Sequence, residues 1–563
     1  MACYYTAEES YTILVDCDGD TLEDSDTNTA SDIDPLNEFS SHGAPPSSTR
    51  GWSGSTAPEH NWVPPNLMAP EIPPFMATPG IAVTVDACEP LNYFELFMSN
   101  DIFELMVEQT NLFANQYLSA NPGSNYNRRN MWHPTDVAEM RKFWALTLVM
   151  GIVKKPSIRS YWCKHPILAT PLFSGVMKRD RYEQMLRFLH FNDNTLSPPR
   201  NDPLFDRLYK IRPFIQLLSD KFSQNYVPNE NICIDESLMK FKGTLLFKQY
   251  IPSKRSRYSI KLFKLCESTT GYIWAFRIYQ GNVSKLDPPG CPDSVGTNGK
   301  IVWDLILPLL NKGYKLWVDN YYTSIALFQN LSCFETLACG TVRKNRRGFP
   351  QTLTRGRRSR GSSSALRKDE MLALRFTDMK DVYMLSTMHD ERTVPVSVRG
   401  GTEQLEKPKC IVDYNKYMEG VHLADQCIQP YLVNRKSRTW YKKIAIYLSQ
   451  IAMFNSYVLY KKEAKGRSYP FLDFMLKILS DILFTHAPNP PSLESDDVQR
   501  LFGKHFPSRI PPTPCKKSPQ RKCRVCYKKG VRKDSSYYCP SCPSLPALCI
   551  TNCYKVYHTE LNY

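Results

Sequence analysis

Ile232-Cys233-Ile234-Asp235-Glu236 is a short apolar run that delivers a carboxylate at its end. The same pattern returns in Leu316-Trp317-Val318-Asp319-Asn320. A buried strand is rigid and its end is open to water, so an Asp there is held still in a place that a metal ion can reach. Two such residues in one basic chain predict a paired-metal site for phosphodiester chemistry. Each Asp alone is weak evidence, because strand ends and helix caps carry Asp in many α/β proteins.

The segments around these two runs alternate between strand and helix patterns. Short β-rich runs come first, and helices then alternate with strands, which is typical of a mixed α/β sheet. We predict strands at 231–235, 244–251, 258–265, 272–280, 315–319 and 336–341, and helices at 297–311 and 323–331.

Charge is distributed unevenly along the 563 residues. The chain has a net charge of +16, and because residues 1–60 contribute −11, the remainder carries +27. Such a charge favours phosphate-rich partners such as nucleic acid. Apolar runs long enough to cross a membrane are absent, and so is a secretory signal, so we expect no membrane partner and a reducing compartment in which the 18 cysteines are thiols or metal ligands.

A third metal ligand is expected from the segment 414–426. It contains His422 and Asp425, which are three residues apart and therefore lie on one face of a helix. Taken alone, this segment says little.

Taken together, these segments resemble the piggyBac family of DNA transposases. The resemblance spans roughly 85–563 and is carried, in order, by Ile234-Asp235-Glu236-Ser237-Leu238-Met239, Tyr250-Ile251-Pro252-Ser253-Lys254, Val318-Asp319-Asn320-Tyr321-Tyr322-Thr323-Ser324, Gly340-Thr341-Val342-Arg343-Lys344-Asn345-Arg346, and Tyr414-Asn415-Lys416 leading to Asp425-Gln426. The resemblance implies an RNase H-like catalytic core with an insertion domain, flanked by helical dimerisation and DNA-binding segments and a C-terminal Cys-rich zinc module.

We divide the chain on this basis and on composition. The expected parts are an acidic disordered tail and Pro-rich linker at 1–84, a helical dimerisation and DNA-binding domain at 85–227, the core at 228–345 and 412–430, an insertion domain at 346–411, a helical DNA-binding or dimerisation segment at 431–487, a linker at 488–520 and a zinc-binding domain at 521–563.

The resemblance also implies the activity: cut-and-paste movement of inverted-repeat DNA into TTAA targets, by a homodimer in the nucleus. Asp235 and Asp319 fall on the first two catalytic aspartates of the family, as ligands of two Mg²⁺ or Mn²⁺ ions. In the third segment the family reads Gly-Val-Asp-x-x-Asp-Gln, whereas this chain has His422 in place of the first Asp and keeps only Asp425.

Three interpretations of this departure remain open. Asp425 takes the ligand position, which we favour; His422 binds the metal directly, although imidazole suits Mg²⁺ less well than a carboxylate; or the site is impaired, as in a domesticated copy. The function is then either an active transposase or a catalytically impaired nuclear DNA-binding protein derived from one.

Two basic clusters are expected to contact DNA phosphates. The first is Arg343, Lys344, Arg346 and Arg347, and the second is Arg435, Lys436, Arg438, Lys442 and Lys443 with the embedded Trp440. Trp440 is placed either to stack on an unpaired base or in the core of the helix that it begins.

Seven potential zinc ligands crowd the C-terminal segment. They are Cys523, Cys526, Cys539, Cys542, Cys549, Cys553 and His558. Two tetrahedral Zn²⁺ sites need eight ligands, and Cys515 is a weak candidate for the eighth. Interleaved pairing around two ions and a single ribbon-like site both remain open.

Overall fold

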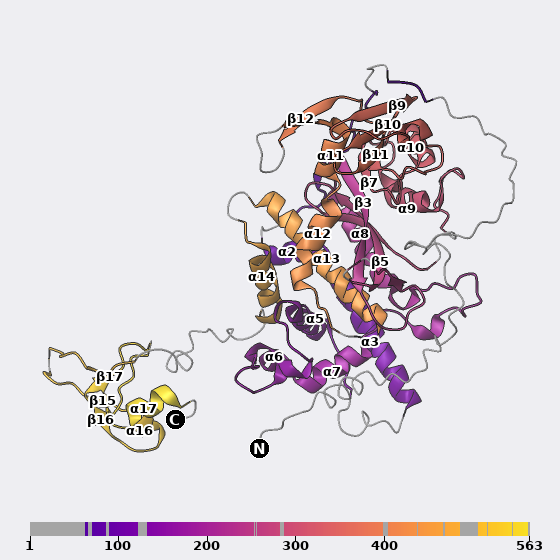
Figure 1. Ribbon diagram of the computed structural model, residues 1–563. Helices are drawn as coiled ribbons and strands as arrows, with labels where there is room; N and C mark the ends of the chain where they lie inside the picture. Colours follow the sequence, from indigo (N-terminus) through magenta and orange to yellow (C-terminus); the bar gives the residue numbers. More distant parts are fainter. Residues whose placement is uncertain are drawn as a thin grey trace. The chain divides into compact units, whose positions relative to one another are not determined.

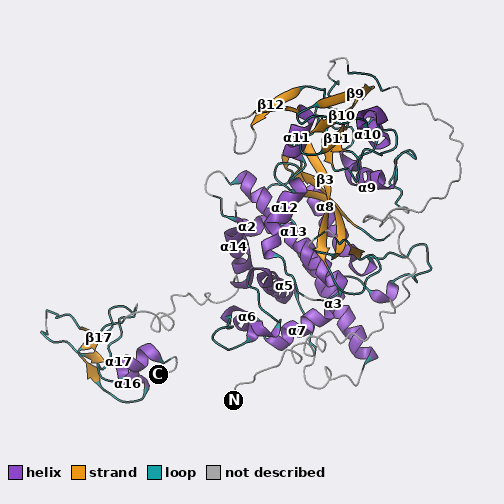
Figure 2. Cartoon of the chain, viewed as in Figure 1, coloured by secondary structure: helices purple, strands orange, loops and turns teal. Residues whose placement is uncertain are grey.

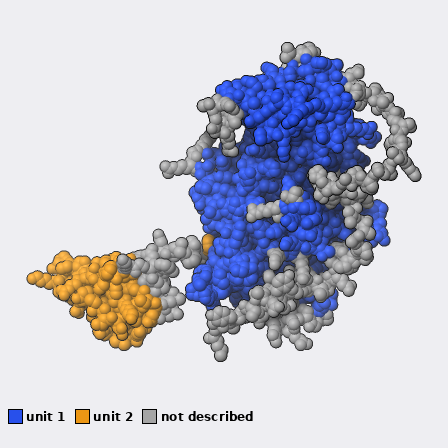
Figure 3. Space-filling view, in the orientation of Figure 1, with its two compact units in different colours: residues 1–483 blue, residues 484–563 orange. Residues whose placement is uncertain are grey.

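The computed structural model describes residues 62–65, 70–85, 89–121, 132–252, 254, 256–281, 286–397, 404–435, 437, 439–464, 468–484, 505–514, 516–542, 544–560 and 563 (Figures 1 and 2). The predicted acidic tail lies outside these residues. The chain forms two compact units, residues 1–483 and 484–563, which are described separately (Figure 3). No described helix has the length and apolar character needed to span a membrane.

A nine-stranded mixed sheet is the framework of the first unit. Its order is β4-β5-β3-β7-β8-β11-β10-β9, with β6 (Ile273–Ile278) paired to β5. β3 (Asn231–Lys240) runs antiparallel to β5 (Tyr258–Glu267) and parallel to β7 (Lys315–Val318), which runs parallel to β8 (Leu337–Thr341). This order confirms the predicted RNase H-like core. The strand expected at 244–251 is reduced to β4 (Gln249–Tyr250).

Helices cover both faces of the sheet. α9 (Thr297–Ile306) and α10 (Ile325–Cys333) pack on one face, against β5 and β8 respectively. α11 (Lys409–Tyr417) and α12 (Gly420–Ile428) pack on β3 from the other side (Figure 1). α12 approaches closely because Gly420 has no side chain: a Cβ there would lie 2.7 Å from Cys233 Sγ. The C-terminal part of the core is therefore brought onto the strand that carries Asp235.

Most of the segment 346–411 continues the same sheet. β11 (Asp381–Ser386) pairs with β8, and β10 (Met371–Thr377) and β9 (Ser363–Lys368) follow, all antiparallel. Only β12 (Thr393–Ser397) and β13 (Gln404–Pro408) form a separate two-stranded ribbon. The segment predicted as an insertion domain thus adds three strands to the sheet of the core and carries a two-stranded ribbon.

The helical segments pack beneath the sheet. They are α2 (Pro90–Glu95), α3 (Asn100–Ala120), α5 (Val137–Ile152), α6 (Pro171–Val176), α7 (Arg179–Phe188), α8 (Arg212–Gln224), α13 (Trp440–Glu463) and α14 (Phe471–Phe484). Asp136 caps α5 by accepting a hydrogen bond from Glu139 N, as its position before the helix predicts. The apolar stripe of α13 is buried. This helix packs against α2, α5 and α8 of the helical region and against α12 of the core.

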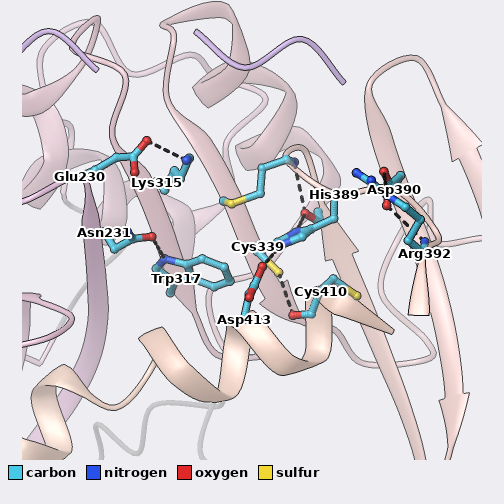
Figure 4. A network of polar contacts seen from close by, with 12 residues as sticks. Glu230, Asn231, Lys315, Trp317, Cys339, His389, Asp390, Arg392, Cys410 and Asp413 are labelled. Atoms are coloured by element: carbon cyan, nitrogen blue, oxygen red, sulfur yellow. Dashed lines mark hydrogen bonds and ion pairs between the residues drawn. The ribbon is translucent and has the colours of Figure 1, made fainter. Parts of the chain in front are cut away.

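A polar network fixes β7 just before Asp319 (Figure 4). Trp317 Nε1 donates to Asn231 Oδ1 at 3.0 Å, and Lys315 pairs with Glu230 at 2.6 Å. On the adjoining elements His389, which is buried, lies between Ser386 Oγ at 2.7 Å and Asp413 Oδ2 at 3.2 Å. These contacts hold the strand end in a defined position against β3 and α11.

Part of the Pro-rich segment before the core is held on the sheet. Val63 exchanges two backbone hydrogen bonds with Arg367 of β9, at 2.9 and 2.8 Å. Further along, Met76 N donates to Lys312 O, and β1 (Gly80–Ile81) pairs with β2 (Tyr226–Val227). The described part of this expected linker is therefore a strap on the core.

The second unit is small and rich in cysteine. It contains β14 (Ser508–Arg509), β15 (Arg521–Lys522), α16 (Arg524–Lys528), β16 (Asp534–Ser535), β17 (Tyr537–Tyr538) and α17 (Cys553–Thr559). Because β14 pairs with β17, the module includes residues that we expected in the linker at 488–520.

Candidate metal and nucleic-acid sites

Asp235 and Asp319 lie at the same level of two neighbouring strands: Asp235 lies within β3, and Asp319 comes directly after β7. Ile234 of β3 is paired with Val318 of β7, and each Asp is the next residue of its chain. The parallel pairing brings both residues to the level at which β7 ends, and the charge of Asp319 contributes to the raised pKa of Asp235, so the two carboxylates share one site. Asp235 is 8% exposed, and the carboxylate of Asp319 accepts a hydrogen bond from Tyr321 N at 2.8 Å. The two predicted residues are thus brought together by strand register alone.

The electrostatics of this site favour a cation. Burial, followed by the charges of Glu236 and Asp319, raises the pKa of Asp235 to about 8. Burial also raises the pKa of Asp319, with Glu236 adding to it. Like charges held together away from water destabilise one another, and a divalent cation relieves that cost. The donor set of carboxylate oxygens is the one that Mg²⁺ and Mn²⁺ prefer.

His422 is the residue of α12 that reaches this pair. Its Nε2 lies 3.4 Å from Asp235 Oδ2, while the side chain is 57% exposed. The nitrogen therefore stands beside the first carboxylate, at the open side of the site.

Asp425, for which we favoured the ligand position, contacts Ser237 and Lys264 in this structure. Its carboxylate accepts from Ser237 Oγ at 2.7 Å and pairs with Lys264 Nζ at 2.8 Å. Lys264 has no exposed surface and also donates to Tyr447 OH at 3.0 Å. His422 and Asp425 do share the helix face that meets β3, as their spacing predicts, but one turns to residue 235 and the other to residue 237. Asp425 anchors the helix.

Glu236 is a third carboxylate that the sequence did not single out. Tyr322 OH donates to its Oε2 at 3.4 Å, and Lys261 Nζ lies 3.9 Å from the same oxygen. Glu236 is the next residue after Asp235 in β3, and its carboxyl group hydrogen-bonds with that of Asp235. Its charge contributes to the raised pKa of both catalytic candidates.

The first basic cluster adjoins the carboxylates. It follows β8 directly, at the same edge of the sheet, and Arg343 Nε donates to Asn320 Oδ1 at 3.1 Å. Arg346 donates to the backbone oxygen of Asn320, and burial lowers the pKa of its guanidinium. Lys344 and Arg347 are exposed. Cationic side chains suited to a phosphate backbone thus contact Asn320, the residue that follows Asp319.

The second basic cluster is only partly available to a partner. Lys442 is 7% exposed and donates to the carbonyl oxygens of Leu186 and Arg187, at 2.9 and 2.8 Å. Trp440 is 8% exposed and packs edge-on against Phe247, which supports the core alternative.

The other members of this cluster differ in their surroundings. Arg435 donates to Tyr161 OH at 2.6 Å, and Lys443 Nζ donates to Arg435 O at 3.2 Å. Burial lowers the pKa of Lys443 to about 8. Lys436 and Arg438 lie outside the described residues. Trp440 and Lys442 are accordingly not carried forward as DNA contacts.

The cysteine-rich unit holds two four-residue clusters whose ligand atoms lie within 4.8 Å of one another. They are Cys523, Cys526, Cys549 and Cys553, and His505, Cys539, Cys542 and His558. The pairs alternate along the chain, which is the interleaved arrangement. His505 is the eighth ligand that sequence reasoning missed, because it precedes the first Cys pair by 18 residues inside the expected linker. Cys515 lies outside the described residues.

The geometry of both clusters fits zinc. Cys526 Sγ lies 3.4 Å from Cys553 Sγ and 3.9 Å from Cys549 Sγ. Sulfurs about 2.3 Å from a tetrahedral ion are separated by about 3.8 Å, so these spacings match. Although burial raises it, backbone N–H groups lower the pKa of Cys523 to about 7, which favours the thiolate that binds metal.

Comparison with known proteins agrees with this geometry. The family model described as "Transposase IS4" matches residues 89–457, and that of a "DDE_Tnp_1-like zinc finger" matches residues 513–559. PiggyBac transposable element-derived protein 3 of Homo sapiens is 26% identical over 486 residues, which cover 84% of this chain and 76% of that protein. PiggyBac transposable element-derived protein 2 of Homo sapiens is 25% identical, over 66% of this chain and 61% of that protein.

A solved structure shares the fold. The cryo-EM structure of a piggyBac transposase synaptic complex with hairpin DNA aligns with a TM-score of 0.64 at 24% identity, covering 84% of this chain and 98% of that one.

Proposed function

This chain belongs to the piggyBac family of transposases, and from that premise we propose that it is a metal-dependent enzyme that cuts and joins DNA strands. The observation that supports the proposal best is the pairing of Ile234 with Val318, the residues that directly precede Asp235 and Asp319. Inverted-repeat ends are the proposed substrate and TTAA sequences the proposed targets. The proposed working form is a homodimer in the nucleus.

Each residue of the site has a role in this proposal. Asp235 and Asp319 supply carboxylate oxygens, and His422 supplies a ring nitrogen beside Asp235. Bound divalent ions would activate the attacking oxygen and stabilise the leaving one. Asp425 and Lys264 position α12, so that His422 faces the carboxylates. Arg343, Lys344 and Arg347 hold phosphates next to Asp319.

Substitution at residue 422 tests catalysis. The assay is Mn²⁺-dependent excision from a plasmid that carries terminal repeats of candidate elements flanked by TTAA. We expect excision by the unaltered protein, loss in Asp235→Asn, and strong reduction in His422→Ala. Asp425→Asn is expected to lower activity through stability and is compared at equal folded fraction. Loss of excision in Asp425→Asn at equal folded fraction, with His422→Ala unaffected, would instead restore Asp425 as the ligand.

A second candidate function follows from His422 itself. The family carries Asp at this position, so the chain is a DNA-binding protein without cleavage activity if the imidazole does not support the metal site. The relatives named above are themselves called transposable element-derived proteins. Excision by His422→Asp alone, with none by the unaltered protein, would establish this alternative.

DNA binding is tested separately from cleavage. Each phosphate contact contributes about 0.9 to the slope of log K against log salt concentration. Lys344→Gln and Arg347→Gln should each reduce the slope by about that amount on a random duplex. Lys477→Gln, an exposed change on α14, should leave it unchanged. Equal slopes for all three variants would remove Lys344 and Arg347 from the DNA interface.

A further inference from the structure

An exposed basic surface borders the proposed catalytic site. We call residues 343–358 the basic turn; apart from Arg343, which donates to Asn320, its exposed cations are Lys344, Arg347, Arg355, Arg357 and Arg358. None of these five makes an ion pair with a described residue, whereas Arg360 pairs with Asp378 at 3.1 Å and Arg375 with Asp381 at 2.8 Å. Cations this close together repel one another, and they destabilise the chain unless an anionic partner neutralises them.

The N-terminal strap is attached to this same turn. Trp62 Nε1 donates to Gly348 O at 3.2 Å, and Gly348 lies between Arg347 and the last cations of the basic turn. The two backbone hydrogen bonds of Val63 with Arg367 fix the next residue on β9. Whatever precedes Trp62 therefore starts from a fixed point on the basic turn.

The preceding residues are strongly acidic. Nine of the twelve acids in residues 1–60 lie between Asp16 and Glu38, and this stretch contains no Lys or Arg. Twenty-four positions separate Glu38 from Trp62. An extended chain covers up to about 3.5 Å per residue, so the acids reach every cation of the turn. Tethering of this kind gives an effective concentration on the order of a millimolar or somewhat below.

We propose that the segment 16–38, which we call the acidic segment, docks on the basic turn of its own chain and competes there with a phosphate backbone. Charge complementarity, the tether at Trp62 and the five unpaired cations support this occupant. Docking of the acidic segment does not depend on whether the protein cleaves DNA. Its competition with a phosphate backbone rests on the proposed function. The contact is electrostatic and weakens with salt.

A cross-linking experiment on the full chain tests docking without DNA. A zero-length carbodiimide joins a carboxylate to a lysine amine only at contact. We expect peptides in which Asp16–Glu38 is joined to Lys344, reduced as salt is raised, with much less joining to Lys477 on α14, which serves as the matched exposed lysine. Equal joining to both lysines, or none to Lys344, would overturn the proposal.

A binding cycle then measures the competition. The acidic segment is neutralised in the full chain by changing its nine acids to Asn and Gln, and the basic turn by Lys344→Gln, Arg347→Gln, Arg357→Gln and Arg358→Gln. For a segment present at about ten times its dissociation constant, neutralising the acids raises affinity for a random 30-base-pair duplex about tenfold at low salt.

The gain should disappear when the basic turn is already neutralised. A gain that persists in that background would place the acidic segment on another surface and overturn the proposal. Cross-links to Lys344 in a protein that shows no excision would leave docking intact while removing the catalytic proposal. Excision without these cross-links would leave the catalytic proposal intact and overturn the docking proposal.

Discussion

The ammonium of Lys264, which has no exposed surface, lies 2.8 Å from Asp425 Oδ1. Burial alone would lower the pKa of Lys264, but Asp425 and then Tyr447 raise it, so the pair is held in its charged form. The pair joins β5 to α12, and through α12 it sets the position of His422 beside Asp235. A buried cation with one carboxylate partner makes this contact sensitive to substitution.

Removing Asp425 should therefore destabilise the first unit. Asp425→Ala leaves the Lys264 charge buried and unpaired, which costs about 3–5 kcal/mol in a dry site; because the Asp425 side chain is 30% exposed, we expect about 2–3 kcal/mol. Urea unfolding followed by tryptophan fluorescence measures this. Asp481→Ala breaks the exposed Lys477–Asp481 pair and should change stability by less than about 0.5 kcal/mol. Equal effects of the two substitutions would contradict the assigned role of Lys264.

Divalent metal should stabilise the protein through Asp235 and Asp319, the proposed metal ligands. Mn²⁺ at a hundredfold excess over its dissociation constant adds about 2.7 kcal/mol to the folded state. We expect a rise in melting temperature that Asp235→Asn and Asp319→Asn each remove. Asp413→Asn, which lies in the network around His389, should retain the rise. A rise of the same size in Asp235→Asn would place the ion elsewhere.

The zinc module should bind two ions per chain. His505→Ala removes one ligand of the second cluster and should reduce zinc content, measured by mass spectrometry of the metal, from two to about one. Cys523→Ser acts on the other cluster and should also lose one. Cys515→Ser is the control and should keep both. Two ions retained by His505→Ala would exclude it from the ligand set.

Acid should lower the free energy of unfolding of the helical region, because His190 is protonated more readily in the unfolded chain. Its ring is buried, stacks on Phe113 at 3.5 Å and lies 3.1 Å from Tyr441 OH. Burial, with the charge of Lys442, lowers the pKa of His190 to about 3. The unfolded chain takes up this proton near pH 6.5, so stability is lost as pH falls from about 6.5 to 3, and by about 2 kcal/mol at pH 5.

Comparison of variants at pH 7 and pH 5 isolates that contribution. His190→Gln should lose less stability than the unaltered protein over this interval. His165→Gln, on the exposed surface, should lose as much as the unaltered protein. An unchanged acid sensitivity in His190→Gln would show that the ring is protonated without unfolding.

The sequence predicts well those features that depend on local pattern. A strand that reaches Asp235, a strand that ends directly before Asp319 and seven of the eight zinc-cluster residues follow from apolar runs and from spacing, although β3 runs on to Lys240, beyond the end predicted at residue 235. Features set by distant partners were missed. No residue near Asp425 in the sequence reveals that its carboxylate pairs with Lys264 of β5, because this ion pair forms only once α12 packs on β3.

The same reason explains the other differences. Lys442 reads as one of several cations, and only the packed fold shows it capping the end of α7. His505 stands apart from the cysteines along the chain and joins them only when β14 pairs with β17. Residues 346–411 read as an insertion because composition changes there, yet three of their strands add to the existing sheet.

The pairing of Val63 with Arg367 also bears on how the protein is best shortened. β9 is the terminal strand of a long sheet, and an uncovered strand edge invites neighbouring molecules to add to it. The few residues of the strap shield part of that edge. A fragment that begins at Trp62 keeps this cover, whereas one that begins within the first helix gives it up and acquires a site for aggregation.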